Sequence, residues 1–187
     1  MATRIVIGLV GDIGAGKGTV AEYLEKKYKF HKHTVSDYIR SEARKRKIHP
    51  TRENLEKLSE RLREKYGTAY FIEKVIEKVE KDGDEKVAID GIRLSSDVRL
   101  VKNHFKHRVK IIFVTAPARL RFERMKKRDR PGDPKYWPEF LALEKKEERE
   151  FHLKHVFALA DHVIDTSGTI KDVGKKVDVL IKHLKSR

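Results

Sequence analysis

Residues 5–19 read IVIGLVGDIGAGKGT, and this stretch decides the fold. Its first part, Ile5–Val10, is an apolar run bounded by glycine, which is typical of a buried strand in a parallel sheet. Its second part, Gly11–Thr19, contains the G-x-x-x-x-G-K pattern that binds nucleoside triphosphates, and a helix is predicted directly after it, over 17–28. A strand, a glycine-rich loop and a helix in this order predict a P-loop domain.

All residues of the loop are candidates for nucleotide contact. Its glycines allow backbone conformations that turn several N–H groups into one concavity, and the helix adds partial positive charge at its N-terminus. Lys17 is placed to reach the β and γ phosphates, so we expect ATP or GTP with Mg²⁺ as the bound nucleotide. The candidate nucleotide-binding residues are Gly11, Asp12, Ile13, Gly14, Ala15, Gly16, Lys17, Gly18 and Thr19.

Two positions in the loop depart from the common pattern. Gly18 stands where Ser or Thr usually contacts Mg²⁺, so Thr19 becomes the candidate metal contact. Asp12 places a carboxylate near the expected phosphates, which it would repel. We therefore expect Asp12 either to face Mg²⁺ or the acceptor, or to be a simple turn residue.

Strand and helix patterns alternate along the rest of the chain. Further strands are predicted at 33–35, 87–89, 109–114 and 163–165. Helices are predicted at 37–47, 51–66, 117–128 and 136–150, from Thr68 through Val79, and from Thr169 onward. This alternation predicts a doubly wound α/β domain with a largely parallel sheet, and the charged segment 119–150 is predicted to be a helical hairpin outside that sheet.

The composition excludes some classes of protein and favours others. The chain has no cysteine, which excludes disulfides and Cys-ligated metals. It has 44 Lys and Arg against 29 Asp and Glu, a net charge of +15, which indicates either a polyanionic partner or a generally basic proteome. The abundance of Lys, Glu and Arg resembles the composition of hyperthermophile proteins. With no apolar run near 18 residues and no signal-peptide pattern, we expect a cytoplasmic protein without a membrane partner.

The segment Ser36-Asp-Tyr-Ile-Arg40 follows the second predicted strand and opens a helix. Because the carboxyl ends of parallel strands border the ligand crevice, Asp37 is a candidate general base for an acceptor hydroxyl. The alternative is that Asp37 only caps the helix. Arg40, one turn later, and Arg44 are candidates for binding the acceptor.

The segment Ala88-Ile-Asp90-Gly-Ile-Arg93 ends the third predicted strand. Asp90 is a candidate Mg²⁺ ligand, acting through water as a carboxylate after such a strand commonly does, and it also lies on the acceptor side. Arg93 is a further candidate for acceptor binding. The alternative interpretation is an ordinary Asp-Gly turn.

The helix predicted at 117–128 and the loop after it are rich in cations. A phosphoryl transition state needs positive charge over its equatorial oxygens, and a closing lid commonly supplies it. We predict that Arg124, Arg128 and Arg130 form such a set, with Arg128 as the catalytic member; the alternative for each is a solvated surface position. The Lys and Arg residues of this segment are Arg119, Arg121, Arg124, Lys126, Lys127, Arg128 and Arg130.

The order of these motifs resembles that of nucleoside monophosphate kinases, and segment 160–168 is similar to the adenine-side loop of dephospho-CoA kinases. The overall likeness, over nearly the whole chain, is to archaeal dephospho-CoA-kinase-like and adenylate-kinase-like proteins. It implies a five-stranded parallel sheet in one P-loop kinase domain over 1–187. It also implies an acceptor-binding helical insertion at about 36–81 and an Arg-rich lid at about 119–150.

Two features favour RNA as the acceptor. Asp37-x-x-Arg40 resembles the element of phage-type polynucleotide kinases in which the Asp is the base for a nucleic-acid hydroxyl. Between 38 and 52, cations also far outnumber carboxylates, as contacts to a phosphate backbone require. An archaeal RNA kinase that phosphorylates a ribose 2′-hydroxyl within tRNA belongs to the dephospho-CoA-kinase-like group, so the resemblance implies tRNA as the partner.

Two other classes of function stay open on the sequence. The first is a small-molecule kinase acting on dephospho-CoA or a nucleoside monophosphate. The second is a nucleotide-dependent RNA-binding factor with weak ATPase activity.

Histidines and aromatic residues outside these motifs give weaker signals. The pairs His31/His33, His104/His107 and His152/His155 are interpreted as solvated rather than metal-binding. Tyr136 and Trp137 either anchor the predicted lid helix or stack on a base. The charged run 144–150 is predicted to be a solvated helix face.

Overall fold

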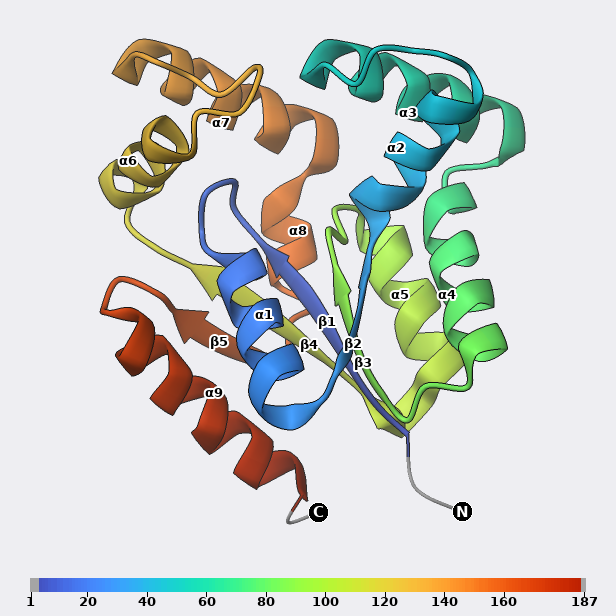
Figure 1. Cartoon of the computed structure of the whole chain (residues 1–187), viewed down its shortest axis with the longest axis vertical. Helices are drawn as coiled ribbons and strands as arrows, with labels where there is room; N and C mark the ends of the chain where they lie inside the picture. The colour runs from blue at the N-terminus through green and yellow to red at the C-terminus, as the bar shows by residue number, and fades with distance from the viewer. Residues whose placement is uncertain (1–3, 186–187) are drawn as a thin grey trace.

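The computed structural model describes residues 4–185, and within them the chain forms a five-stranded parallel sheet flanked by helices (Figure 1). The strands are β1 (Ile5–Gly11), β2 (His31–Thr34), β3 (Lys86–Asp90), β4 (Val109–Thr115) and β5 (His162–Asp165). Their order across the sheet is β2-β3-β1-β4-β5, with the P-loop strand at the centre. The predicted doubly wound parallel sheet is thereby confirmed.

The helices follow the predicted pattern with two additions. They are α1 (Lys17–Tyr28), α2 (Val35–Lys45), α3 (Arg52–Tyr66), α4 (Tyr70–Asp82), α5 (Ser95–Phe105), α6 (Ala118–Arg128), α7 (Trp137–Phe151), α8 (Leu153–Phe157) and α9 (Ile170–Lys185). A 3₁₀ turn, η1 (Lys106–Arg108), follows α5. The sequence analysis assigned no element to α5 or α8. It also placed the cap of α4 at Thr68, whereas Ala69 occupies that position.

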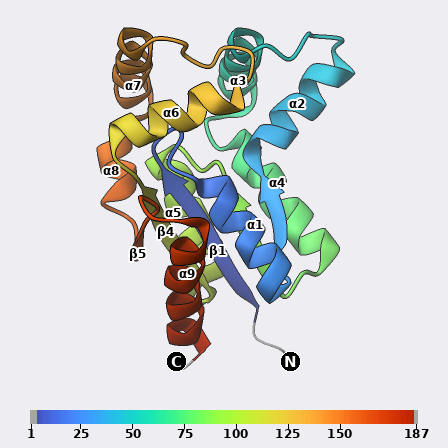
Figure 2. The same cartoon turned by 60° about the vertical axis from the view of Figure 1, so that its left-hand side comes forward.

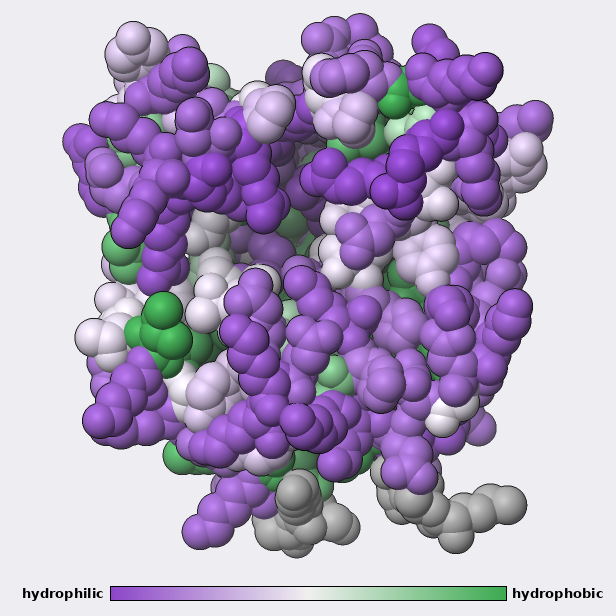
Figure 3. All heavy atoms as spheres, viewed as in Figure 1, coloured by the Kyte–Doolittle hydropathy of each residue, from purple (hydrophilic) through white to green (hydrophobic). Residues whose placement is uncertain are grey.

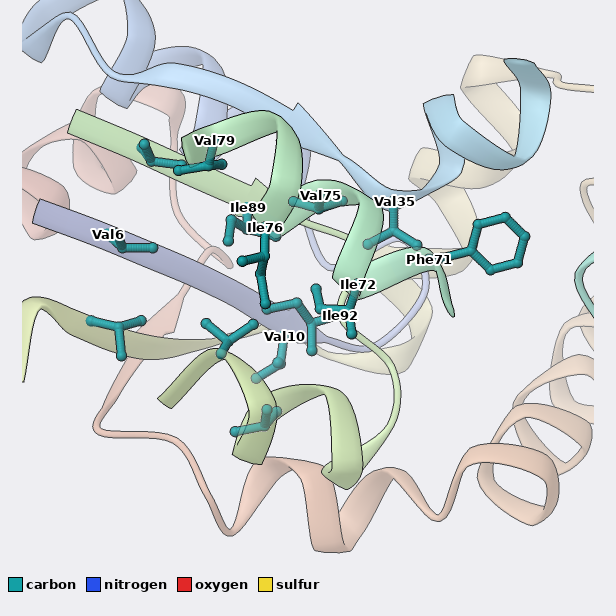
Figure 4. Packing of buried hydrophobic residues seen from close by; sticks show 14 of the residues in the cluster. Val6, Val10, Val35, Phe71, Ile72, Val75, Ile76, Val79, Ile89 and Ile92 are labelled. Atoms are coloured by element: carbon teal, nitrogen blue, oxygen red, sulfur yellow. The ribbon is translucent and has the colours of Figure 1, made fainter. Parts of the chain in front are cut away.

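Alternating residues of β1 build two apolar layers, one on each face of the sheet. Val6 and Val10 point into the larger layer, which α2, α4 and α5 cover (Figure 4). Ile7 and Leu9 point into the second layer, which α1 and α9 cover. All four side chains are fully buried, so the central strand and the loop it carries rest on a packed core.

Helices α2, α3, α6 and α7 gather at one end of the molecule in both ribbon views (Figures 1 and 2). The P-loop after β1 lies at the same end, because parallel strands all end on the same side of the sheet. In Figure 3, mostly hydrophilic side chains border a recess between the α6–α7 side and the α2–α3 side. Within residues 4–185, every helix is too short or too polar to cross a lipid bilayer.

Candidate functional site

The P-loop folds around its own lysine. Lys17 opens α1, and its Nζ donates to the carbonyl oxygens of Gly11 at 2.7 Å and Asp12 at 2.9 Å. Burial lowers the pKa of Lys17, and the carboxylate of Asp90 is the strongest influence that raises it. The cation is thus held over the loop by backbone oxygens, from which it can move to a phosphate.

Gly14 and Gly16 have φ angles of 75° and 90°, values that side chains with a Cβ rarely adopt. At Gly14 an added Cβ would also lie 2.7 Å from the carbonyl oxygen of Arg121. We expect Gly14→Ala to destabilise the protein by about 1 to 3 kcal/mol. Alanine disfavours the positive φ angle at this position, and its Cβ would lie too close to the carbonyl oxygen of Arg121. Urea unfolding without nucleotide measures the change.

Gly18 supplies the matched control for this prediction. An added Cβ there would meet no described atom within 4 Å, and the residue lies in the first turn of α1. Gly18→Ala should therefore leave stability unchanged or raise it slightly. Equal unfolding midpoints for the two variants would contradict the role given to the left-handed backbone at Gly14.

Arg121 supports the loop from the lid side. It is buried, its Nε donates to the carbonyl oxygen of Ala116 at 2.9 Å, and one guanidinium nitrogen donates to that of Ile13 at 3.3 Å. The other nitrogen lies 2.5 Å from the carboxylate of Glu144 on α7. The sequence analysis counted Arg121 among lid cations, but the structure uses it to join β4, the P-loop and α7.

Of Arg124, Arg128 and Arg130, Arg124 is the one that reaches the P-loop, through Thr166. Its guanidinium donates to the hydroxyl of Thr166 at 2.9 Å and to the carbonyl oxygen of the same residue at 2.6 Å. The Thr166 hydroxyl in turn donates to the carbonyl oxygen of Ala15 at 2.7 Å. An ideal Cβ at Gly16 would lie 3.6 Å from Arg124. Arg124 therefore already borders the phosphate loop.

The other two predicted lid cations, Arg128 and Arg130, contact Asp133. Arg128 is exposed and makes a two-pronged ion pair with Asp133, with N–O distances of 2.6 and 2.8 Å. Arg130 is exposed too, and its backbone N–H donates to the Asp133 carboxylate. The structure thus holds Arg128 and Arg130 around one carboxylate in the loop between α6 and α7.

The acceptor-side motifs meet where β2 and β3 end. Thr34 pairs with Asp90 across the two strands, and Gly91 packs on Val35 at the start of α2. Asp37 lies in the first turn of α2 and is exposed to solvent. The Asp90 carboxylate, in contrast, is the main charge that opposes the lowered pKa of Lys17. Of the two predicted carboxylates, Asp90 is the one coupled to the P-loop.

The other predicted site residues, on α2, α1 and the P-loop, differ in how exposed their side chains are. Arg40 is half-buried on α2, whereas Arg44, one turn later, is exposed. Thr19, the predicted metal contact, is also exposed on α1. Asp12 is half-buried, and this burial raises the pKa of its carboxyl while Arg121 and Lys17 lower it.

Glu147 on α7 is a residue of the candidate site that the sequence analysis missed. Its side chain is buried, and one carboxylate oxygen accepts from Arg52 at 2.7 Å and from Arg93 at 3.2 Å. The prediction that 144–150 is a solvated face is therefore wrong at Glu147 and at Glu144. A usable signal existed, because Phe140, Glu144 and Glu147 have the i, i+4, i+7 spacing of one helix face.

An open hollow of about 400 Å³ lies between the P-loop and α7. Asp12 and Ile13 line it from the loop, and Glu144, Glu147 and Glu148 are among its residues on α7. Most residues that line the hollow are charged, and one of them is Glu147, the carboxylate that binds Arg52 and Arg93. It is large enough to take a ligand group next to the loop.

Trp137 anchors α7 against α6. Its ring stacks on Phe140 at a centroid distance of 5.3 Å, meets Phe122 edge-on, and lies 3.9 Å from the guanidinium carbon of Arg119. Tyr136 is exposed. Trp137 therefore anchors the predicted lid helix, as one of the two interpretations expected, whereas the ring of Tyr136 lies at the surface.

Asp97, a buried residue in the first turn of α5, was also missed. Burial raises the pKa of its carboxyl to about 6, and the nearest guanidinium nitrogen, from Arg63, is 3.9 Å away. This pKa lies above the value of an unfolded Asp, about 3.9, so the folded state binds the proton more tightly than the unfolded state. The resulting contribution to the free energy of unfolding is present below about pH 4 and is lost as the pH rises through 6. The loss is of the order of 2 to 3 kcal/mol.

We expect Asp97→Asn to gain stability relative to the wild type as the pH is raised from 4 to 7. Chemical unfolding at several pH values measures this difference. Asp172→Asn is the control with the opposite sign, because hydrogen bonds from Thr169 lower the pKa of that exposed carboxyl. If the free energies of unfolding of the wild type and of Asp97→Asn changed with pH in the same way, the pKa of Asp97 would not be raised by burial.

Comparisons with known proteins agree with this architecture. Residues 10–138 match the model of a family described as an AAA domain. A UPF0200 protein of Hyperthermus butylicus is 33% identical over 183 residues, covering 98% of this chain and 96% of that protein. A UPF0200 protein of Pyrococcus horikoshii is 36% identical over 185 residues, with coverages of 97% and 98%.

Solved kinase structures share the fold at low sequence identity. The shikimate kinase of Acinetobacter baumannii in complex with shikimate superposes with a TM-score of 0.63 at 19% identity, covering 100% of this chain and 97% of that one. The deoxyadenosine kinase of M. mycoides gives a TM-score of 0.56 at 16% identity, with coverages of 98% and 100%. These likenesses show a P-loop kinase fold.

Proposed function

This chain belongs to the UPF0200 family of P-loop kinase-like proteins, and on that premise we propose that it is a kinase acting on RNA. It transfers the γ-phosphate of ATP or GTP to a hydroxyl, for which our candidate is an internal ribose 2′-hydroxyl of tRNA. The observation that carries the kinase assignment is the P-loop: its Lys17 is held by loop carbonyl oxygens, burial lowers the pKa of this lysine, and the negative charge of Asp90 raises it. A nucleotide-binding loop with a carboxylate at the next strand end is the arrangement that phosphoryl transfer requires.

The donor half of the reaction uses the P-loop. Backbone N–H groups of the loop and Lys17 bind the phosphates, and Arg124 lies next to Gly16 to receive charge on the transferring group. The hydroxyl of Thr19 and the carboxylate of Asp90 are hard oxygen ligands of the kind Mg²⁺ prefers. When bound, the ion neutralises the phosphate oxygens during transfer.

The acceptor half uses the start of α2. Asp37 accepts the proton of the acceptor hydroxyl, whose oxygen forms the new bond to the γ-phosphorus. The bond from that phosphorus to the bridging oxygen breaks, and the nucleoside diphosphate leaves. The exposed position of Asp37 suits an acceptor that arrives on a large molecule and presents its hydroxyl from outside.

The charges of α2 support an RNA acceptor. Arg44, Lys45, Arg46 and Lys47 form an exposed basic end of this helix, here called the α2 basic end. Lys45 and Arg46 share one carboxylate, that of Glu42, so the surface keeps a net positive charge. Contacts of several cations with a phosphate backbone fix a nucleic acid without reading its sequence.

A labelling experiment tests the proposal. The protein is incubated with γ-³²P-ATP or γ-³²P-GTP and total tRNA, alongside dephospho-CoA and the nucleoside monophosphates. We expect label in tRNA that resists phosphatase, as an internal phosphate on a folded RNA would. Salt-sensitive tRNA binding without any transferred label would replace the kinase with an RNA-binding factor.

A small phosphorylated acceptor is the second candidate, and one observation favours it. Arg52 and Arg93 converge on a single carboxylate oxygen of Glu147, so together they have the geometry to hold one phosphate. Label found only in dephospho-CoA or in a nucleoside monophosphate would establish this candidate. The α2 basic end would then be a general surface property.

A further inference from the structure

Two histidines and two carboxylates meet outside the P-loop site, at the outer strand β2 and the turn between α4 and β3. His31 and His33 are two residues apart on β2, so their side chains leave the same face of the strand. Asp82 ends α4, and Asp84 lies two positions later, after Gly83. We propose that these four side chains, here called the His–Asp cluster, form a binding site for Zn²⁺.

The distances suit the coordination shell of this ion. His33 Nε2 lies 3.1 Å from one carboxylate oxygen of Asp84, and His31 Nδ1 lies 3.3 Å from the other. Ligand atoms of His33, Asp82 and Asp84 all lie within 4.8 Å of one another. Tetrahedral zinc with bonds of about 2.0 to 2.2 Å separates its ligands by about 3.3 to 3.6 Å. His33, Asp82 and Asp84 form the compact part of the shell, and His31, which lies outside this group of three, would have to turn toward the ion to complete it.

The backbone turn explains why two carboxylates reach the same place. Gly83 ends α4 in the left-handed conformation, with φ of 70°, and reverses the chain between Asp82 and Asp84. Two cations lie at this turn. Arg4 Nε donates to the backbone oxygen of Asp84, and the carboxylate of Asp84 faces the two imidazoles. Lys78 pairs with the carboxylate of Asp82, so the ion would take the place of this lysine at Asp82.

Burial within the cluster is graded from inside to outside. The side chains of His33 and Asp84 are each 10% exposed, whereas that of His31 is 65% exposed. Buried ligands fix the geometry, and the exposed ones leave a path by which an ion enters. The sequence analysis interpreted His31 and His33 as solvated, which is wrong for His33.

A metal here would connect segments that are distant in the chain. His33 and Asp84 are 51 residues apart in sequence, and they belong to the outer strand and to the turn that precedes β3. Because an unfolded chain does not preform such a site, binding of the ion stabilises the folded state. The proposed ion is therefore structural, and its binding does not depend on the nucleotide site.

Titration of the chelator-treated, tag-free full chain with Zn²⁺ in a calorimeter tests the proposal, together with Co²⁺ as a spectroscopic probe. We expect one equivalent to bind, the intense visible bands of tetrahedral Co²⁺, and a higher unfolding temperature with metal. His33→Ala should abolish all three responses. Absence of saturable binding to the wild type would overturn the proposal.

Three further variants keep the test decisive. His152→Ala/His155→Ala removes two imidazoles at the junction of α7 and α8 and should bind metal like the wild type. Asp82→Asn changes an exposed residue at a helix end, so it carries the test if His33→Ala does not fold. Unchanged affinity in Asp82→Asn and His33→Ala would show that the metal binds elsewhere. Lys17→Met should retain the zinc response, which separates this site from nucleotide binding.

Discussion

Replacing Lys17 with Met is expected to lower phosphoryl transfer about 10²- to 10³-fold, the loss typical of removing one preorganised donor to a developing charge. The Nζ of Lys17 is held at the loop by the carbonyl oxygens of Gly11 and Asp12, and it exchanges these contacts for phosphate oxygens when nucleotide binds. Met fills a similar volume and keeps α1 in place. Initial rates of label transfer under saturating nucleotide measure the effect.

Lys26→Met is the matched control, because Lys26 is an exposed lysine of the same helix. It should transfer phosphate at the wild-type rate. Nucleotide binding, followed by a fluorescent analogue, should weaken in Lys17→Met and stay unchanged in Lys26→Met. A Lys17→Met protein with full transfer activity would remove the P-loop from the mechanism.

Replacing Asp37 with Asn is expected to slow transfer about 10²- to 10⁴-fold, the usual contribution of a general base. Nucleotide binding should be unaffected, because Asp37 lies on α2 and not on the P-loop. The rate should fall without a matching change in the acceptor KM, since Asn keeps the size of the side chain and loses only its basicity. Steady-state kinetics with the identified acceptor separate these quantities.

Two comparisons make this result specific to Asp37. Glu53→Gln neutralises an exposed carboxylate in the corresponding first turn of α3 and should leave the rate unchanged. Asp90→Asn should instead raise the Mg²⁺ concentration needed for half-maximal activity. Wild-type turnover in Asp37→Asn, with a large loss in Asp90→Asn, would transfer the role of base to Asp90.

The sequence predicted the sheet and the P-loop because both depend on local patterns. The apolar run of β1, the glycines after it and the caps at Thr51 and Gly67 each act within a few residues. Helix α5 escaped prediction although Val98, Val101 and Phe105 have helical spacing, because polar residues separate this short pattern. Helix α8 is five residues long, which is too short for periodicity to reveal.

The candidate site was predictable only where its residues lie in motifs. The partners of Glu147, Arg52 and Arg93, are 95 and 54 residues away in sequence, so a charged helix gives no local sign of them. Asp97 was missed for the same reason, since its pKa depends on burial that only the packed fold creates. Long-range burial made Glu147 a part of the site, although its helix was predicted to be solvated.

The carboxylate of Glu147 acts as a built-in counter-ion for the acceptor side. In the resting protein it pairs with both Arg52 and Arg93, and Glu56 also pairs with Arg52, so two carboxylates offset the two guanidinium charges. Binding a phosphate there is an exchange of one anion for another, which releases few salt ions. The affinity of that step therefore depends weakly on ionic strength, whereas contacts at the α2 basic end are strongly salt-dependent.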